Sequence, residues 1–166
     1  AEESVAIQSK AHGDDDWRTR TARDYLKYAD RLSKLDEAQR DELAKAAAEF
    51  QKALNANRQR KFREGLDHAA PAVEKFAKIL GGEDYLQAER NYWLGQLQSS
   101  MQQFDDAAKS FTRAAEMYQN SVGEAHPDRA ACLHALAAVM REQMKFADSA
   151  ATFRQAWQLR EQLLGA

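Results

Sequence analysis

The side chains best suited to metal binding or nucleophilic chemistry are few, and they are scattered along the chain. The four histidines are His12, His68, His126 and His134, and the single cysteine is Cys132. His12 lies near the N-terminus and His126 precedes a proline in a connecting segment, while His68 and His134 are expected on different helices and different faces. We therefore predict no metal site. Cys132 lies in an alanine-rich run, where we expect a small buried hydrophobic residue rather than a reactive thiol.

Acidic residues gather at two places where paired carboxylates could share acid–base work. One run extends from Asp14 to Asp16, and the other pair is Asp105 and Asp106. Both stand where a helix is expected to begin, and carboxylates there cap the helix and interact favourably with its dipole. The sequence contains no glycine-rich phosphate loop, no His-Glu-x-x-His, no Gly-x-Ser-x-Gly and no paired cysteines. These patterns predict a protein that is not an enzyme and that holds no cofactor.

The composition indicates which elements must carry the remaining function. Hydrophobic residues make up 44% of the 166 residues and charged residues 30%, with only 7 Gly and 2 Pro. Because Ala, Gln, Arg, Glu, Lys and Leu dominate, the natural prediction is an all-α fold. The net charge of -2 gives no basic face for nucleic acid. No stretch approaches the roughly 20 apolar residues that a membrane span needs, and nothing indicates a compartment.

The strongest signal is an internal repeat of 42 residues, visible as columns of identical residues. The columns are Phe62, Phe104 and Phe146; Gly81, Gly123 and Gly165; Ala72, Ala114 and Ala156; and Ala46, Ala88 and Ala130. Apolar residues within each unit recur at the three- and four-residue spacing of a helix face. Each unit is therefore predicted to be a helical hairpin, ended by a glycine in the left-handed conformation.

The pattern predicts seven helices. Their expected ranges are 15–33, 37–58, 62–80, 86–102, 104–121, 128–143 and 146–163. Pro71 falls inside one of them and is expected to kink or locally break it. The predicted organisation is a mobile segment at 1–13, an N-terminal helix region at 14–43 that packs on the array, and three repeats over 44–166 (about 44–85, 86–127 and 128–166).

The second and third units resemble the tetratricopeptide repeat (TPR), specifically the 42-residue kind found in kinesin light chains. The resemblance rests on Leu94-Gly95, Phe104-x-x-Ala107 and Phe111-x-x-Ala114, with similar spacing around Phe146 and Phe153. The connection from Gly123 to His126-Pro127 is similar to that of kinesin light chains. The resemblance implies an α-solenoid, a right-handed superhelix of antiparallel hairpins whose first helices line a concave groove.

The resemblance also implies which side chains face that groove. From the first, second and third units in turn they are Phe50, Asn57, Arg58; Glu89, Tyr92, Gln96, Ser99; and His134, Arg141. Such a surface suits an extended peptide or a partner helix. Phe50 and Tyr92 could instead be packing residues. Away from the groove, Trp93 and Trp157 are expected in the core or between repeats, and Trp17 and Tyr25 are expected to seal the N-terminal helix against the first hairpin.

Three functional hypotheses follow. The leading one is a scaffold or adaptor module that binds a protein or peptide and belongs to a longer protein. The alternatives are a structural spacer or self-association segment, and a peptide-sensing regulatory domain of a larger effector. The chain begins with Ala1 rather than Met and ends on a repeat boundary without a polar capping helix. We expect its open last repeat to be completed by further residues or by a second copy of the chain, giving a homo-oligomer.

Overall fold

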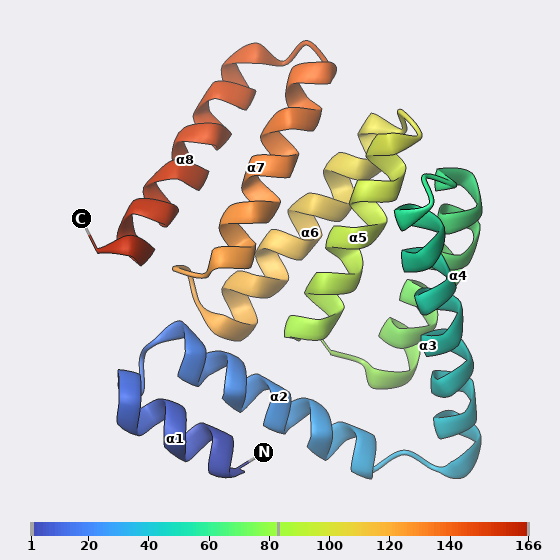
Figure 1. The fold of residues 1–166 in the computed structure, drawn as a ribbon, viewed down its shortest axis with the longest axis vertical. Helices are drawn as coiled ribbons and strands as arrows, with labels where there is room; N and C mark the ends of the chain where they lie inside the picture. Colours follow the sequence, from blue (N-terminus) through green and yellow to red (C-terminus); the bar gives the residue numbers. More distant parts are fainter. Residues whose placement is uncertain (1, 83, 166) are drawn as a thin grey trace.

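The structure, a computed structural model, describes residues 2–82 and 84–165. This part of the chain forms eight helices and no strand. The helices are α1 (Glu2–His12), α2 (Trp17–Ser33), α3 (Glu37–Arg58), α4 (Phe62–Leu80), α5 (Tyr85–Ser100), α6 (Phe104–Val122), α7 (Pro127–Glu142) and α8 (Phe146–Leu164). The last six helices form three antiparallel hairpins, α3–α4, α5–α6 and α7–α8, which stack side by side (Figure 1). The fold is therefore an α-solenoid.

The seven predicted helices are all present. The bounds of α3 and α4 are those that the pattern predicts, and the other five differ from the prediction by one or two residues at an end. One difference concerns the first unit. Helix α4 runs through Pro71 without a break, and both this proline and Asp67, whose carbonyl it leaves without a helical partner, are exposed residues.

Small residues allow the helices of neighbouring elements to approach closely. A Cβ atom added to Gly95 of α5 would lie 2.8 Å from the ring of Phe111 in α6. One added to Gly65 of α4 would lie 2.8 Å from the side chain of Leu97 in α5. Ala53 and Ala137, which belong to α3 and α7, are fully buried. The repeated small residues thus set the spacing within and between hairpins.

The turn inside each hairpin has the same backbone form. Its middle residue has a positive φ in all three hairpins, with values of 60° at Arg60, 59° at Gln102 and 63° at Met144. These residues are 42 positions apart and none is glycine. The repeat therefore extends to the backbone geometry of the turns, at the conformational cost that a side chain brings in the left-handed region.

Helix α2 does not stack as another hairpin. It lies across the ends of the repeats, beneath the connections that lead into α5 and α7, and α1 packs along its outer side (Figure 1). Arg31 of α2 contacts Gly82 and pairs with Asp84, while Arg20 lies against Gly123. Both inter-repeat connections therefore receive an arginine from one crossing helix.

Two expectations about the N-terminal region need correction. Where a mobile segment is predicted at 1–13, the structure has helix α1, none of whose described residues is buried; residue 1 lies outside the described part. Trp17 and Tyr25 do not contact the first hairpin: Trp17 packs against His126 and Tyr25 against Tyr85. Because α2 crosses the array, residues near its C-terminus cover the first hairpin instead, namely Tyr28, Leu32 and, just beyond it, Leu35.

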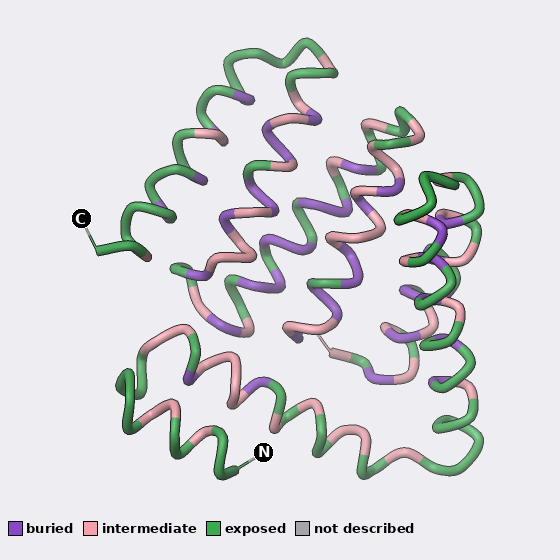
Figure 2. The backbone as a smooth tube through the Cα atoms, in the orientation of Figure 1, coloured by how far each residue is buried: buried purple, intermediate pink, exposed green. Residues whose placement is uncertain are grey.

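Burial is concentrated in the middle of the array (Figure 2). The largest core cluster joins α6 to α5, α7 and α8 around Met117, Tyr118 and Leu133. Cys132 is fully buried in this cluster, as predicted, and burial raises the pKa of its thiol. Trp93 packs between repeats as predicted, but Trp157 is 63% exposed on α8 and lies in no core. No described helix covers the outer side of α8, which accounts for that difference.

Candidate binding groove

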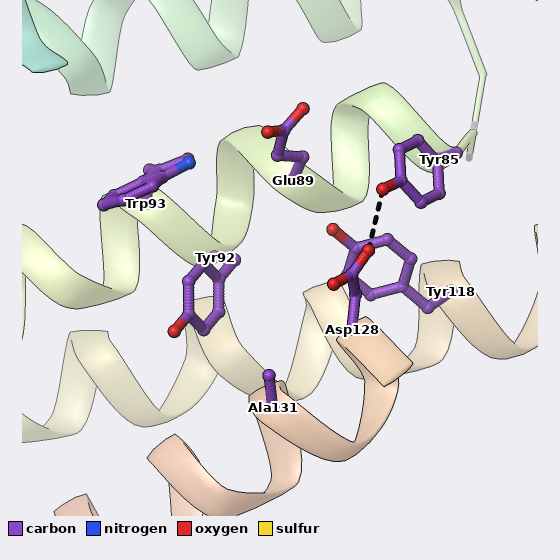
Figure 3. A pocket seen from close by; sticks show the side chains of 7 residues that line it. All are labelled: Tyr85, Glu89, Tyr92, Trp93, Tyr118, Asp128 and Ala131. Atoms are coloured by element: carbon purple, nitrogen blue, oxygen red, sulfur yellow. Dashed lines mark hydrogen bonds between the residues drawn. The ribbon is translucent and has the colours of Figure 1, made fainter. Parts of the chain in front are cut away.

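A hollow of about 210 Å³ lies between the N-terminal halves of α5 and α7 (Figure 3). Its walls are mainly aromatic, and two carboxylates face it. The lining residues are Tyr85, Glu89, Tyr92, Trp93, Tyr118, Asp128 and Ala131. The hydroxyl of Tyr85 donates a hydrogen bond of 2.7 Å to Asp128 Oδ2, which ties the start of α5 to the start of α7. We call this space the aromatic hollow.

A second hollow of about 260 Å³ continues along the same two helices. It is lined by amide, hydroxyl and imidazole groups as well as by apolar side chains. Its residues are Tyr92, Gln96, Ser99, Phe111, Ala131, His134, Ala135, Ala138 and Arg160. Tyr92 and Ala131 line both hollows, and Gln96 Nε2 donates a 2.9 Å hydrogen bond to the Tyr92 hydroxyl. We call this space the polar hollow; together the two hollows form one groove along α5 and α7.

The helix starts that border the aromatic hollow are held by side chains from α2 and from the connections. Tyr85 N–H, the first of α5, donates to Asp24 Oδ2 at 2.7 Å, while Asp84 accepts from Gln87 N–H. Asp24 is buried, and desolvation raises the pKa of its carboxyl, with the nearby charge of Asp84 adding to the effect and the Tyr85 N–H opposing it. Helix α5 thus begins on two carboxylates, one of them supplied by α2.

His126 performs the corresponding task for α7. Its Nδ1 accepts a 3.1 Å hydrogen bond from Asp128 N–H, so Nε2 carries the proton and donates to Thr21 Oγ1 of α2 at 3.1 Å. Its ring stacks on Tyr118, with 6° between the planes. Only 1% of His126 is exposed, and burial lowers the pKa of its imidazole. The histidine is therefore a neutral helix cap and a link to α2.

The charges that face the aromatic hollow are negative and unpaired by any base within it. Desolvation raises the pKa of Glu89, and the nearby charge of Asp128 raises it further, against smaller opposing effects from Arg90 and Trp93. Burial, followed by the hydrogen bond to Asp128, raises the pKa of the Tyr85 hydroxyl. Two acidic side chains and no basic one therefore line the hollow between its aromatic walls.

The structure brings five of the predicted groove residues together. Glu89 and Tyr92 line the aromatic hollow, and Tyr92, Gln96, Ser99 and His134 line the polar hollow. The imidazole of His134 packs edge-on against Phe153, with ring centroids 5.1 Å apart. These residues come from the second and third repeats, so the groove is formed between their first helices, α5 and α7.

The other predicted residues lie outside the two hollows. Phe50 is only 8% exposed and packs in the core of the first hairpin with Val73 and Phe76, because Leu54, Trp93 and Leu94 cover it. Asn57 and Arg58 lie at the C-terminal end of α3, where Arg58 bonds to Asn55. Arg141 is exposed near the end of α7 and pairs with Glu142 at 3.1 Å. The first repeat and the far end of α7 therefore contribute nothing to these hollows.

The aromatic hollow also contains residues that were not predicted to line the groove, among them Tyr85, Tyr118 and Asp128. Tyr85 and Asp128 stand in the first turns of their helices. Tyr118 is nearly buried on α6, a second helix of a hairpin. Only the pairing of Tyr85 with Asp128 across two repeats brings them to one site, and no spacing along the chain shows that contact.

The described residues, 2–82 and 84–165, also bear on metal sites and membrane spans. Across these ranges no group of three His, Cys, Asp or Glu side chains is placed to hold a metal ion. Among the same residues, none of the helices has the length and apolar character needed to cross a membrane.

Known structures share this arrangement of helical hairpins. The crystal structure of BtubC (BKLC) from P. vanneervenii has a TM-score of 0.64 and 21% identity, covering 99% of this chain and 56% of that chain. A putative kinesin light chain from Podosopora anserina, with nearly identical TPR-like repeats, has a TM-score of 0.64 and 15% identity, covering 99% and 86%. A singly substituted form of the same protein gives 0.65, with 15% identity and coverage of 99% and 85%. No curated protein matches the sequence.

The stacked hairpins and the groove along their first helices define a class of protein, the superhelical repeat protein. Residues 86–162, which span the second and third hairpins, match the tetratricopeptide repeat family. This part of the chain matches tetratricopeptide repeats, and the resemblance seen in its sequence is confirmed. The chain spans little more than half the length of BtubC, so what that whole protein does is not transferred to it.

Proposed function

We propose that the chain is a non-enzymatic binding module whose groove along α5 and α7 receives an extended peptide segment of a partner protein. The observation that carries this proposal is the continuity of the two hollows through Tyr92. The groove offers aromatic surface, amides and hydroxyls in a row along two parallel helices, which suits side chains projecting from an extended backbone. The TPR fold supports the same role, since such repeats form protein-binding scaffolds.

The test is peptide binding by the whole chain. A library of random linear peptides is selected on the immobilised chain, and the affinity of the selected peptides is measured by fluorescence anisotropy. Ser99→Arg places a long charged side chain in the polar hollow, while Ser100→Arg changes its exposed neighbour, which lines neither hollow. We expect Ser99→Arg to weaken binding at least tenfold and Ser100→Arg to leave it unchanged, with helicity retained in both.

Tyr92 and Arg141 give a second comparison. Tyr92→Ala removes the side chain shared by both hollows and is expected to abolish binding, whereas Arg141→Ala should have a small effect because Arg141 lines neither hollow. Since Tyr92 also packs against the core, its variant is assessed only if circular dichroism shows a folded chain. Failure to select any peptide, or equal binding by the Ser99→Arg variant and the wild type, would remove the proposed groove.

A second function, self-association through α8, is favoured by one specific observation. Phe146, Trp157 and Leu164 are exposed by 58%, 63% and 86%. Their counterparts 42 residues earlier include Ala115 and Val122, which are buried where α7 packs on α6. We propose that a second copy of the chain covers this outer face of α8. Sedimentation velocity should then show dimers that Trp157→Glu dissociates; a monodisperse monomer at high concentration would exclude the proposal.

A further inference from the structure

The aromatic hollow lacks the charge that would balance it. Glu89 and Asp128 face it, and none of its seven lining residues is basic. Arg90, the next residue after Glu89, points to the other side of α5, where its guanidinium lies 3.6 Å from the Phe76 ring centroid and donates to the Tyr28 hydroxyl. His126, which lies behind Asp128, is neutral because it caps α7 through Nδ1.

From this geometry we infer that the aromatic hollow is a subsite for a cationic side chain, lysine or arginine, of the peptide that the groove binds. The inference rests on the proposed peptide-binding function and adds to it the chemical class of one ligand residue. A cation in the hollow would lie close to the carboxylates of Glu89 and Asp128 and to the rings of Tyr92 and Trp93, which line it. Aromatic faces attract cations through their quadrupole, most strongly at tryptophan.

The size and surroundings of the hollow fit one side chain better than a larger ligand. Its volume of about 210 Å³ is below the range of roughly 300–1,000 Å³ typical of sites for drug-sized molecules. The polar hollow shares Tyr92 and Ala131 with it, so a peptide lying along α5 and α7 can place one residue in each hollow. The two carboxylates come from different repeats, which makes the subsite depend on the stacking of the second repeat on the third.

The electrostatic state of neighbouring groups supports the inference. Burial, and then the charges of Glu89 and Asp128, raise the pKa of the Tyr25 hydroxyl, which lies beside the hollow on α2. Burial and the charge of Asp128 likewise raise the pKa of Tyr118. The negative charges of Glu89 and Asp128 therefore act on both tyrosines. A bound cation would oppose these charges and would lower the cost of holding Glu89 ionised.

The first experiment uses small probes and the whole chain. N-acetyl-lysine methylamide and N-acetyl-arginine methylamide are titrated into the ¹⁵N-labelled protein, and the indole N–H signals of its three tryptophans are followed. The neutral control probe is the same lysine amide acetylated at Nε. We expect both cationic probes to shift the signal of Trp93 and not those of Trp17 or Trp157, and the neutral probe to shift none. The two cationic arms show which of the two side chains is preferred.

Matched variants connect the binding to the carboxylates. Glu89→Gln keeps the shape of the side chain and removes its charge, and we expect it to weaken cation binding about fivefold, the effect of about 1 kcal/mol. Asp128→Asn tests the second carboxylate. The control is Glu116→Gln, an exposed carboxylate of α6 that does not line the hollow. Equal binding of the neutral probe, no binding of either cation, or unchanged affinity in Glu89→Gln would overturn the inference.

A second experiment separates this inference from the proposed function. Each lysine or arginine of a selected groove-binding peptide is replaced by glutamine, and binding to the wild type and to Glu89→Gln is compared in a double-mutant cycle. We expect one basic position to couple to Glu89 by at least threefold. If peptide binding depends on Ser99 but no basic position couples to Glu89, the groove is supported and the cationic subsite is refuted. If lysine amide binds but no peptide does, the subsite is supported and the proposed peptide-binding function is refuted.

Discussion

Helices α6 and α8 hold the same place in successive hairpins, but only α6 has a neighbour on both sides. Phe111 of α6 is 1% exposed and packs with Leu136 and Val139 of α7, whereas its counterpart Phe153 is only partly buried. Val122 is 1% exposed and its counterpart Leu164 is 86% exposed. Figure 2 shows the same contrast along the two helices.

The comparison teaches that the next hairpin, more than the residue itself, decides how much each position contributes to stability. In a linear array each repeat contacts only its neighbours, so stability is close to a sum of repeat and interface contributions. The outer face of α6 is stabilised by its own repeat and by the interface with the next repeat, whereas the outer face of α8 has only the contribution of its own repeat. Equivalent substitutions in the two helices should therefore have unequal effects, while substitutions in features that do not depend on a neighbour should have equal effects.

The largest difference is expected at the repeated phenylalanines. Phe111→Ala leaves a cavity against Gly95 and the α7 core, and should lower the free energy of unfolding by about 3–5 kcal/mol. Phe153→Ala should cost about 1–2 kcal/mol, because the side chain is partly exposed and its described ring contact is to His134. Urea unfolding followed by circular dichroism measures both. Equal losses of stability in the two variants would show that packing of the next hairpin does not determine the effect of the substitution.

Exchanging the residues at the outer face sharpens the comparison. Ala115→Trp gives α6 the side chain that α8 carries at this position, and it should destabilise the chain by about 1–3 kcal/mol, because Ala115 is 5% exposed and leaves no room. Trp157→Ala should change the free energy of unfolding of the monomer by less than about 0.5 kcal/mol, since Trp157 lies on the open face of the single chain. A tolerated tryptophan at 115 would mean that α6 and α7 pack more loosely than the structure indicates.

Much of this arrangement is readable from the sequence, because its determinants are local or periodic. The 42-residue columns place six helices of the array, and Gly81 ends α4 with a φ of 58° as a left-handed cap. Once the repeat is recognised, the register also identifies side chains of the first helices, and Tyr92, Gln96 and Ser99 do line the groove in the structure.

The features that the sequence does not predict arise from contacts between distant residues. The crossing of α2 depends on pairs such as Thr21 with His126, which are 105 residues apart, and no periodicity marks them. Phe50 has the register of a groove residue but is covered by side chains that include Trp93 of the next repeat. The two carboxylates that line the aromatic hollow, Glu89 and Asp128, likewise come from different repeats.

The start of α7 offers a test of how the last repeat is held. His126→Ala removes the cap of α7 and should cost about 1–2 kcal/mol. Because burial lowers the pKa of His126 below its unfolded value near 6.5, the wild type has the full contribution of the neutral ring above that value. The contribution is lost as the pH falls below about 6.5 and the unfolded chain takes up the proton preferentially.

The matched variant for this pH dependence is His126→Asn, which can cap a helix but does not titrate. We expect the wild type to lose more stability than this variant between about pH 7.5 and about pH 5.5, as measured by urea unfolding at each pH. The control is His68→Gln. His68 lies on α4 and pairs with Glu49 of α3, away from α7, so this variant should lose as much stability as the wild type over the same pH range. Parallel pH profiles of the wild type and His126→Asn would refute a buried neutral cap.

The smallest effect is expected in the turns, where the comparison predicts equality. Gln102 and Met144 have φ values of 59° and 63° in the second and third hairpins, and neither angle depends on a neighbouring repeat. Gln102→Gly and Met144→Gly relieve the steric cost of a side chain in this conformation but give the unfolded chain more freedom. Each should therefore raise the free energy of unfolding by no more than about 1 kcal/mol, by the same amount within error. If one variant raised the free energy of unfolding and the other lowered it, the neighbouring repeat would be shown to influence even the local backbone of the turn.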